Sequence, residues 1–220
     1  LYDFTDNENA FFDVDAGNDL TMCADLGCGD ASIRVLPRNT YDPGTGGNVT
    51  THDFINYGTF TSGANTMRVS GSWDDNATTT LTNSSIIFTA TSSTEFIDEN
   101  GATTTGLNNV TFGETTGTAT WRASSTLDVN GNLIVSQGTY ARGSTTITIA
   151  GNLTTEANGF WTGMGTTTFD GTNPSTWTDQ NATVQNIGRV VVDGTAKTLL
   201  LGSTTTVQSL TIGADDTFDA

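Results

Sequence analysis

Short runs of alternating apolar residues are the feature that most constrains the fold of this chain. In each run the apolar side chains stand two positions apart, which places them on one face of a β-strand. Five such runs are Met67–Val69, Leu127–Val129, Leu133–Val135, Ile147–Ile149 and Leu210–Ile212. Gly, Asn and Asp interrupt the runs about every 8–12 residues, a spacing typical of all-β chains. No segment has the periodicity of an amphipathic helix, and the sequence therefore predicts an all-β fold.

The composition agrees with strands and excludes several classes of partner. Thr, whose branched side chain fits a pleated surface, makes up 46 of 220 residues. Lys and Arg number 7 against 24 Asp and Glu, which gives a formal charge of −17 at pH 7. Because so few cations cannot neutralise a phosphate backbone, we expect no nucleic-acid partner. No apolar run approaches the roughly 20 residues of a transmembrane helix, so we expect no membrane span.

An internal repeat organises most of the chain. The segment that begins at Gly58 realigns 80 positions later, at Gly138, with glycines on glycines and apolar residues in register. We infer two copies of one supersecondary unit, at about residues 54–133 and 134–212, with a third beginning at Thr217. The repeat region as a whole therefore spans residues 48–220.

Two architectures suit an all-β repeat of about 80 residues. In a β-solenoid (a parallel β-helix), each repeat contains three or four coils of roughly 20–25 residues, stacked at about 4.8 Å. In tandem β-sandwiches, each repeat is one domain. Short strand-like runs, polar turns and recurring Thr favour the solenoid, and residues 132–135 cross the repeat junction without a linker. We predict a β-solenoid of stacked Thr/Gly/Asn-rich coils, with tandem β-sandwich domains as the alternative.

Four stretches of the repeat region resemble the repeats of large secreted bacterial surface proteins. These stretches are Thr126–Leu133, Gly138–Tyr140, Thr146–Leu153 and Thr167–Thr172. They are similar to repeats in the β-helical passenger regions of autotransporters and in filamentous-haemagglutinin-type adhesins. The resemblance covers about residues 50–218 and implies a β-helical fold and an extracellular or cell-surface location. It brings no catalytic motif.

The N-terminal segment, residues 1–47, differs from the repeats in being acidic and in holding both cysteines. We predict that Cys23 and Cys28 form a disulfide in an oxidising compartment. Three aspartates of the segment resemble part of a calcium loop but lack its full pattern, so solvated loop carboxylates remain the alternative. These weak calcium candidates are Asp13, Asp15 and Asp19. No other cofactor is expected.

Enzymes with a β-helix fold can act on polysaccharides, and glycoside hydrolysis needs two carboxylates at a set separation. The acidic candidates are Asp74, Asp75, Glu95, Asp98, Glu99 and Glu114. Trp73 and Trp121 align with leucines of the second copy, so we expect core residues there and not sugar-stacking platforms. Phe160, Trp161 and Trp177 lack that argument and are candidates for exposure. Basic residues are too sparse for lyase chemistry, and we expect no enzyme.

A stack of repeats is open at both ends, and each end needs a cap or a partner. We hypothesise that residues 1–47 act as a cap or as a docking strand for the C-terminal end of the next subunit, which gives a head-to-tail homopolymer. The candidate self-association residues are Tyr2, Phe4, Phe11, Phe12 and Phe218. The sequence thus predicts a structural subunit of an extracellular or cell-surface fibre. The alternatives are an adhesin stalk or glycan-binding segment with surface glycans as partners, and then a polysaccharide lyase or hydrolase.

Overall fold

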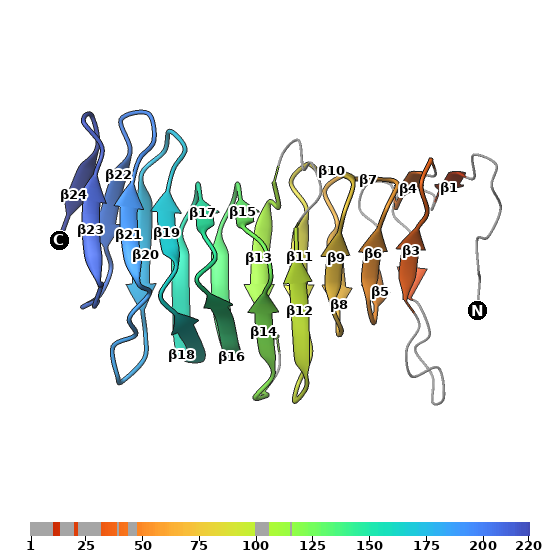
Figure 1. Ribbon diagram of the computed structural model, residues 1–220, viewed down its shortest axis with the longest axis horizontal. Helices are drawn as coiled ribbons and strands as arrows, with labels where there is room; N and C mark the ends of the chain where they lie inside the picture. The colour runs from red at the N-terminus through yellow and green to blue at the C-terminus, as the bar shows by residue number, and fades with distance from the viewer. Residues whose placement is uncertain are drawn as a thin grey trace.

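The computed structural model describes residues 11–13, 20–21, 32–38, 40–43, 48–99, 106–114 and 116–220. Over these residues the chain forms a parallel β-solenoid of about nine turns and contains no helix. Figure 1 shows the coils stacked along the long axis of the molecule, from the N-terminal to the C-terminal side. The predicted solenoid is confirmed. Every strand pairing in the described part is parallel, which rules out the antiparallel sheets of the β-sandwich alternative.

A complete coil has three strands, and their ladders form three faces of the solenoid. Face 1 contains β3 (Ile33–Val35), β6 (Phe54–Asn56), β9 (Trp73–Asp75), β12 (Thr94–Asp98), β14 (Thr120–Ala123) and the C-terminal parts of β16 (Leu133–Gly143) and β18 (Leu153–Gly163). Face 2 consists of two separate ladders. The first contains β1 (Phe11–Asp13), β4 (Thr40–Asp42), β7 (Thr59–Ser62) and β10 (Thr78–Leu81), and the second contains β15 (Leu127–Val129), β17 (Ile147–Ile149), β19 (Thr166–Phe169), β21 (Arg189–Val192) and β23 (Ser209–Ile212). Face 3 contains β2 (Leu20–Thr21), β5 (Val49–Thr51), β8 (Thr66–Val69), β11 (Ser85–Phe88), β13 (Asn109–Phe112), the N-terminal parts of β16 and β18, β20 (Ser175–Asp179), β22 (Thr198–Leu201) and β24 (Thr217–Asp219).

The unit that stacks is a coil of about 20 residues. On face 3, for example, Val49 pairs with Met67, and Met67 pairs with Ile86. Ile147, which lies 80 positions after Met67, is on face 2. The sequence repeat at this offset therefore aligns strands that share their alternation but belong to different faces. The described strands of the N-terminal segment join the same ladders, because β1 pairs with β4 and β3 pairs with β6.

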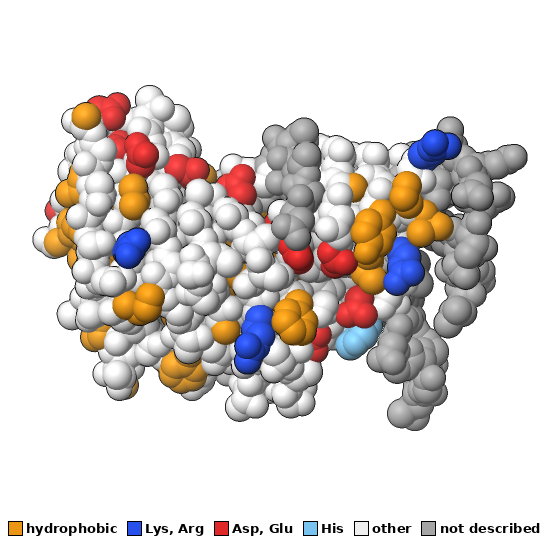
Figure 2. Space-filling model, viewed as in Figure 1, with side chains coloured by type: hydrophobic (Ala, Val, Ile, Leu, Met, Phe, Trp, Pro, Cys, Tyr) orange, Lys and Arg blue, Asp and Glu red, His pale blue; other side chains and the backbone are white. Residues whose placement is uncertain are grey.

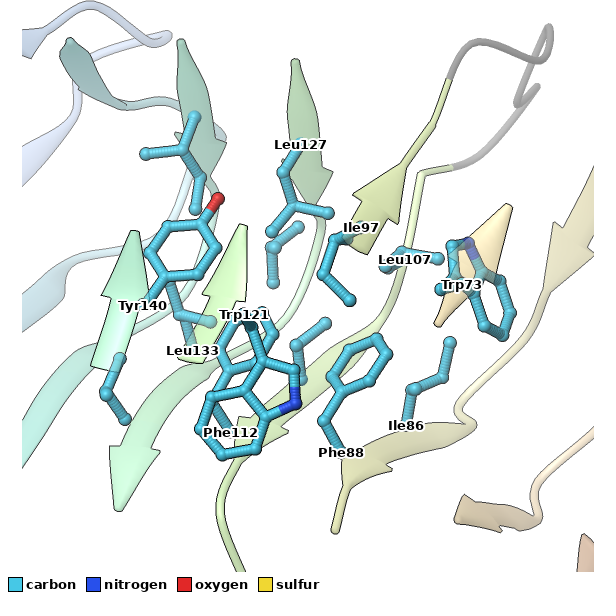
Figure 3. Packing of buried hydrophobic residues seen from close by; sticks show 14 of the residues in the cluster. Trp73, Ile86, Phe88, Ile97, Leu107, Phe112, Trp121, Leu127, Leu133 and Tyr140 are labelled. Carbon is cyan, nitrogen blue, oxygen red and sulfur yellow. The ribbon is translucent and has the colours of Figure 1, made fainter. Parts of the chain in front are cut away.

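A column of aromatic rings fills much of the interior. Its ring contacts, with centroids 4.3–6.4 Å apart, run through Tyr41, Phe60, Phe54, Trp73, Phe88, Phe112, Tyr140 and Trp161. Figure 3 shows the middle of this column, with Trp73, Phe88, Phe112 and Tyr140 among neighbouring aliphatic side chains that point inward from strands of all three faces. Trp73 and Trp121 are fully buried, which confirms the prediction that they are core residues. Offset and edge-to-face ring contacts add about 0.5–1.5 kcal/mol each beyond their burial.

Asparagines join consecutive coils at the corner before face 3. The backbone N–H of Asn132 donates to Asn109 Oδ1 (3.0 Å), and the backbone N–H of Asn152 donates to Asn132 Oδ1 (2.9 Å). The row ends at Thr176, whose backbone N–H donates to Asn152 Oδ1 (2.8 Å). Each amide oxygen thus satisfies a corner N–H of the next coil, where the strand ladder is interrupted. This explains the recurrent Gly-Asn-Leu motif of the sequence.

Phe112 provides a test of the aromatic column. It is fully buried and stacks between Phe88 and Tyr140, with centroids at 4.9 and 4.7 Å. We expect F112A to lower the free energy of unfolding by about 3–5 kcal/mol, because it removes these contacts and leaves a cavity. The control is F96A, since Phe96 is 54% exposed on face 1 and its loss should change stability by about 0.5 kcal/mol or less. Urea denaturation measures both, and equal losses would contradict the assignment.

Candidate functional site

The last coil of the described chain presents an apolar surface together with unpaired strand edges. Leu210 and Ile212 pair in register with Val190 and Val192 of β21, which are buried. The same inward-facing positions on β23 are 38% and 45% exposed. Within the described residues, neither β23 nor β24 has a strand on its outer side. We call this the terminal surface, formed by Val207, Leu210, Ile212 and Phe218.

The candidate self-association residues fall into three groups. Phe218 lies on β24, pairs with Leu199 and belongs to the terminal surface. Phe11 and Phe12 lie on β1, whose backbone pairs with β4, so this part of the N-terminal segment is the first described rung of face 2. Tyr2 and Phe4 lie outside the described residues.

A shallow groove of about 400 Å³ lies on face 1, over β6, β9 and β12. It is lined by Asp53, Ile55, Ser72, Trp73, Asp74, Phe96, Asp98 and Ser124. Asp74 and Asp98 are in-register neighbours on adjacent strands, so two carboxylates stand side by side next to an exposed aromatic ring. Figure 2 shows acidic, basic and hydrophobic side chains gathered over the N-terminal half of the solenoid.

The other acidic candidates are buried or form other contacts, so they do not add a carboxylate to the groove. Glu95 is buried and accepts a hydrogen bond from Ser72 Oγ (3.1 Å). Glu114 forms a bidentate ion pair with Arg68, with nitrogen–oxygen distances of 2.7 and 2.9 Å. The hydrogen bonds from Arg68 lower the pKa of the Glu114 carboxyl. Asp75 and Glu99 lie on the inner side of the solenoid. The structure thus brings only Asp74 and Asp98 together at the surface.

The sequence-based expectation for the aromatic candidates is partly wrong. Trp161 and Trp177 are 5% and 1% exposed, so neither is a surface platform. Phe160, on the outer side of β18, is 43% exposed. Strand alternation explains the difference, because Phe160 and Trp161 are neighbours in sequence and therefore point to opposite sides of the strand.

The predicted disulfide and calcium loop fall on parts of the chain that are not described. Cys23, Cys28, Asp15 and Asp19 lie outside the described residues, and the backbone of Asp13 pairs with that of Asp42 in the β1–β4 ladder. Among the residues that are described, no group of three or more His, Cys, Asp or Glu side chains is arranged to hold a metal ion.

Two buried cations were not anticipated from the sequence. Arg142 is fully buried and donates to Thr167 Oγ1 (2.6 Å), to the Gly165 carbonyl (2.8 Å) and to the Ile187 carbonyl. Its guanidinium also lies over the Trp161 ring, 5.4 Å from the centroid. Burial lowers the pKa of Arg142 to about 10, which leaves it charged at neutral pH.

Lys197 is the second buried cation. Its Nζ donates to the Ala150 carbonyl (2.6 Å), and the side chain is fully buried. Burial lowers the pKa of Lys197, and the charges of Asp170 and Asp216 partly offset that effect. Both cations therefore bind backbone carbonyls of other coils, which is an alternative to carboxylate pairing for a buried positive charge. Only the register of the coils could have revealed these contacts.

Comparison with known protein families, with curated proteins and with solved structures found no match. Over the described residues, the structure also contains no helix of the length and hydropathy needed to cross a bilayer. The geometry of the chain itself therefore carries the functional argument.

Arg142 gives a second test of the structure. We expect R142A to lower the free energy of unfolding by about 2–4 kcal/mol, because it leaves buried carbonyls without a donor. The control is R122A, since Arg122 is an exposed residue of β14. Denaturant unfolding of the two variants should separate them clearly, and a neutral effect of R142A would show that the carbonyls do not depend on the guanidinium.

Proposed function

We propose that this protein is a structural subunit of an extracellular or cell-surface fibre, assembled head to tail by β-strand contacts. The observation that supports the proposal is the parallel, in-register stacking of like coils, which allows any such coil to receive another on its edge. Leu210 and Ile212 on β23 are the apolar positions that a further coil would cover. The occupant that we propose for the terminal surface is the N-terminal coil of a second copy.

The polarity of the strands supports a head-to-tail contact. All strands of a face run in the same direction, so a ladder continues in parallel only if the next copy has the same orientation. The first and last described strands are β1 and β23 on face 2, which consists of two ladders, and β2 and β24 on face 3. Stacking of two copies therefore places β1 against β23 and β2 against β24. Such a contact is heterologous and propagates without closing.

Burial supplies a driving force for this contact. Complete burial of a Leu or Ile side chain contributes about 1.5–3 kcal/mol relative to full exposure. Leu210 and Ile212 are less than half exposed, so each supplies part of that amount, and the backbone hydrogen bonds of two ladders add to it. The charge of −17 opposes close approach of copies, so we expect assembly to depend on salt or divalent cations.

Electron microscopy of the purified protein near neutral pH, with and without calcium, tests the proposal. We expect filaments with an axial repeat of about 45 Å, the length of about nine coils at about 4.8 Å each. I212K should abolish them, because it places a charge within the stacking surface, and deletion of residues 1–14 should also abolish them because it removes β1.

The matched control for I212K is T211K, which places the same charge on the outward side of the same strand. It should fold and assemble like the parent protein. Discrete monomers of the parent in every condition would refute the fibre proposal. Filaments that survive I212K would show that copies meet elsewhere.

A second candidate function rests on the groove of face 1. An exposed ring beside two carboxylates is suited to a sugar residue, which offers an apolar face and hydroxyl donors. Glycan binding of this kind fits the adhesin alternative and needs no assembly. Titration with soluble oligosaccharides, followed by the chemical shifts of groove residues, would test it, with F96A as the variant that should not respond.

A further inference from the structure

Two carboxyl groups lie one above the other inside the solenoid. Asp74 and Asp98 are in-register partners on β9 and β12, so the residues that follow them, Asp75 and Glu99, occupy the same place in consecutive coils. Asp75 is fully buried. The Oε2 atom of Glu99 is likewise shielded from solvent. The pair sits at the corner between face 1 and face 2.

Each carboxyl has one oxygen that is bound and one that is not. Asp75 Oδ1 accepts from Asn56 Nδ2 (2.9 Å) and from the Ala77 backbone N–H (3.2 Å), and the Thr79 side chain also hydrogen-bonds to the Asp75 carboxyl. Glu99 Oε1 accepts from Trp73 Nε1 (2.5 Å). Asp75 Oδ2 and Glu99 Oε2 have no hydrogen-bond partner in the described part of the chain. A buried oxygen of an ionised carboxylate without a donor is costly.

The charged groups around this pair make double ionisation worse. Glu99 faces the carboxyl groups of Asp75, Asp128 and Asp98, and Asp75 faces that of Asp74. Among the described residues, no cation acts on either group. Burial raises the pKa of Glu99 well above its usual range, and the neighbouring charges raise it further. Burial likewise raises the pKa of Asp75, although its hydrogen-bond donors oppose the effect.

We infer that Asp75 and Glu99 share one proton at neutral pH. This proton forms a hydrogen bond that connects the coil of β9 to the coil of β12. One proton converts an unpaired oxygen into a donor, so a carboxyl of one coil bonds the carboxylate of the next. Its loss at higher pH leaves two adjacent buried charges and loosens this joint. The pair is thus a pH-sensitive element within the solenoid.

The direction of the pH effect follows from linkage. In the unfolded chain a Glu titrates near pH 4.3, whereas in the folded chain Glu99 keeps its proton to higher pH. Between these two values the folded state binds more protons than the unfolded state, so stability falls as pH rises. One such group raises the unfolding equilibrium constant by up to about tenfold for each pH unit in this window.

The test combines infrared spectroscopy with unfolding across pH. At neutral pH the parent protein should show the C=O band of a protonated carboxylic acid, and E99Q should lack it. E99Q should also lose the contribution of Glu99 to the pH dependence of the unfolding equilibrium constant. Gln has the shape and charge of a protonated Glu and can donate to Asp75 Oδ2, so E99Q should fold. The matched control is E156Q, because Glu156 is partly exposed and bonded to Ser136, and it should keep both the band and the pH dependence.

Three results would overturn the inference. The first is a parent protein without a protonated carboxyl band at neutral pH. The second is an E99Q variant with the pH dependence of the parent, or one that does not fold. The third is stability that rises with added calcium while the band is absent, which would place a cation between the two carboxylates instead of a proton. None of these measurements depends on filament formation.

Discussion

Parallel hydrogen bonding between coils is the constraint on which the rest of this structure depends. Most strands pair with the strand one coil before and one coil after, so most strand positions stack on their own equivalents along the axis. An inward residue must therefore pack on inward residues of two neighbours. The aromatic column from Tyr41 to Trp161 combines ring contacts at paired positions of one face, such as Phe88–Phe112 and Tyr140–Trp161, with contacts between faces, such as Phe112–Tyr140. Stability accumulates coil by coil.

Polar side chains at corners and coil junctions bond backbone groups that the strand ladder leaves unpaired, at the surface in the case of Asn132 and Asn152 and in the interior in the case of Arg142. Asn109, Asn132 and Asn152 supply acceptors to the next coil, and Arg142 supplies donors to carbonyls. These contacts replace the missing ladder bonds with side-chain ones. Asp75 and Glu99 also lie at a corner, but their hydrogen bonding is incomplete, because each carboxyl keeps one oxygen without a partner in the described structure. That incompleteness is what makes the corner sensitive to protonation.

The period-two pattern predicted the strands, because alternation depends only on local geometry. Short runs with polar turns and recurring Thr favoured the solenoid, and the alignment of Trp73 and Trp121 with leucines of the second copy predicted that both are buried. The period-two pattern has one limit. It could not assign a strand to a face. Met67 and Ile147 share a pattern but lie on different ladders, and coil lengths vary enough to prevent the assignment from spacing alone. The burial of Arg142 and Lys197 could not be predicted from the sequence either, because charged residues are usually exposed and the carbonyl partners of these two lie tens of residues away.

The long-range hydrogen bonds of Arg142 and Lys197 should change how this part of the molecule unfolds. Arg142 bonds the Ile187 carbonyl and Lys197 bonds the Ala150 carbonyl, and each contact crosses an intervening coil. A solenoid with contacts only between adjacent coils can fray one coil at a time from an end. Here, if one coil between residues 142 and 197 opens, a buried charge or a buried carbonyl two coils away loses its hydrogen-bond partner. These coils should therefore open as one cooperative unit, whereas coils without such long contacts can fray singly.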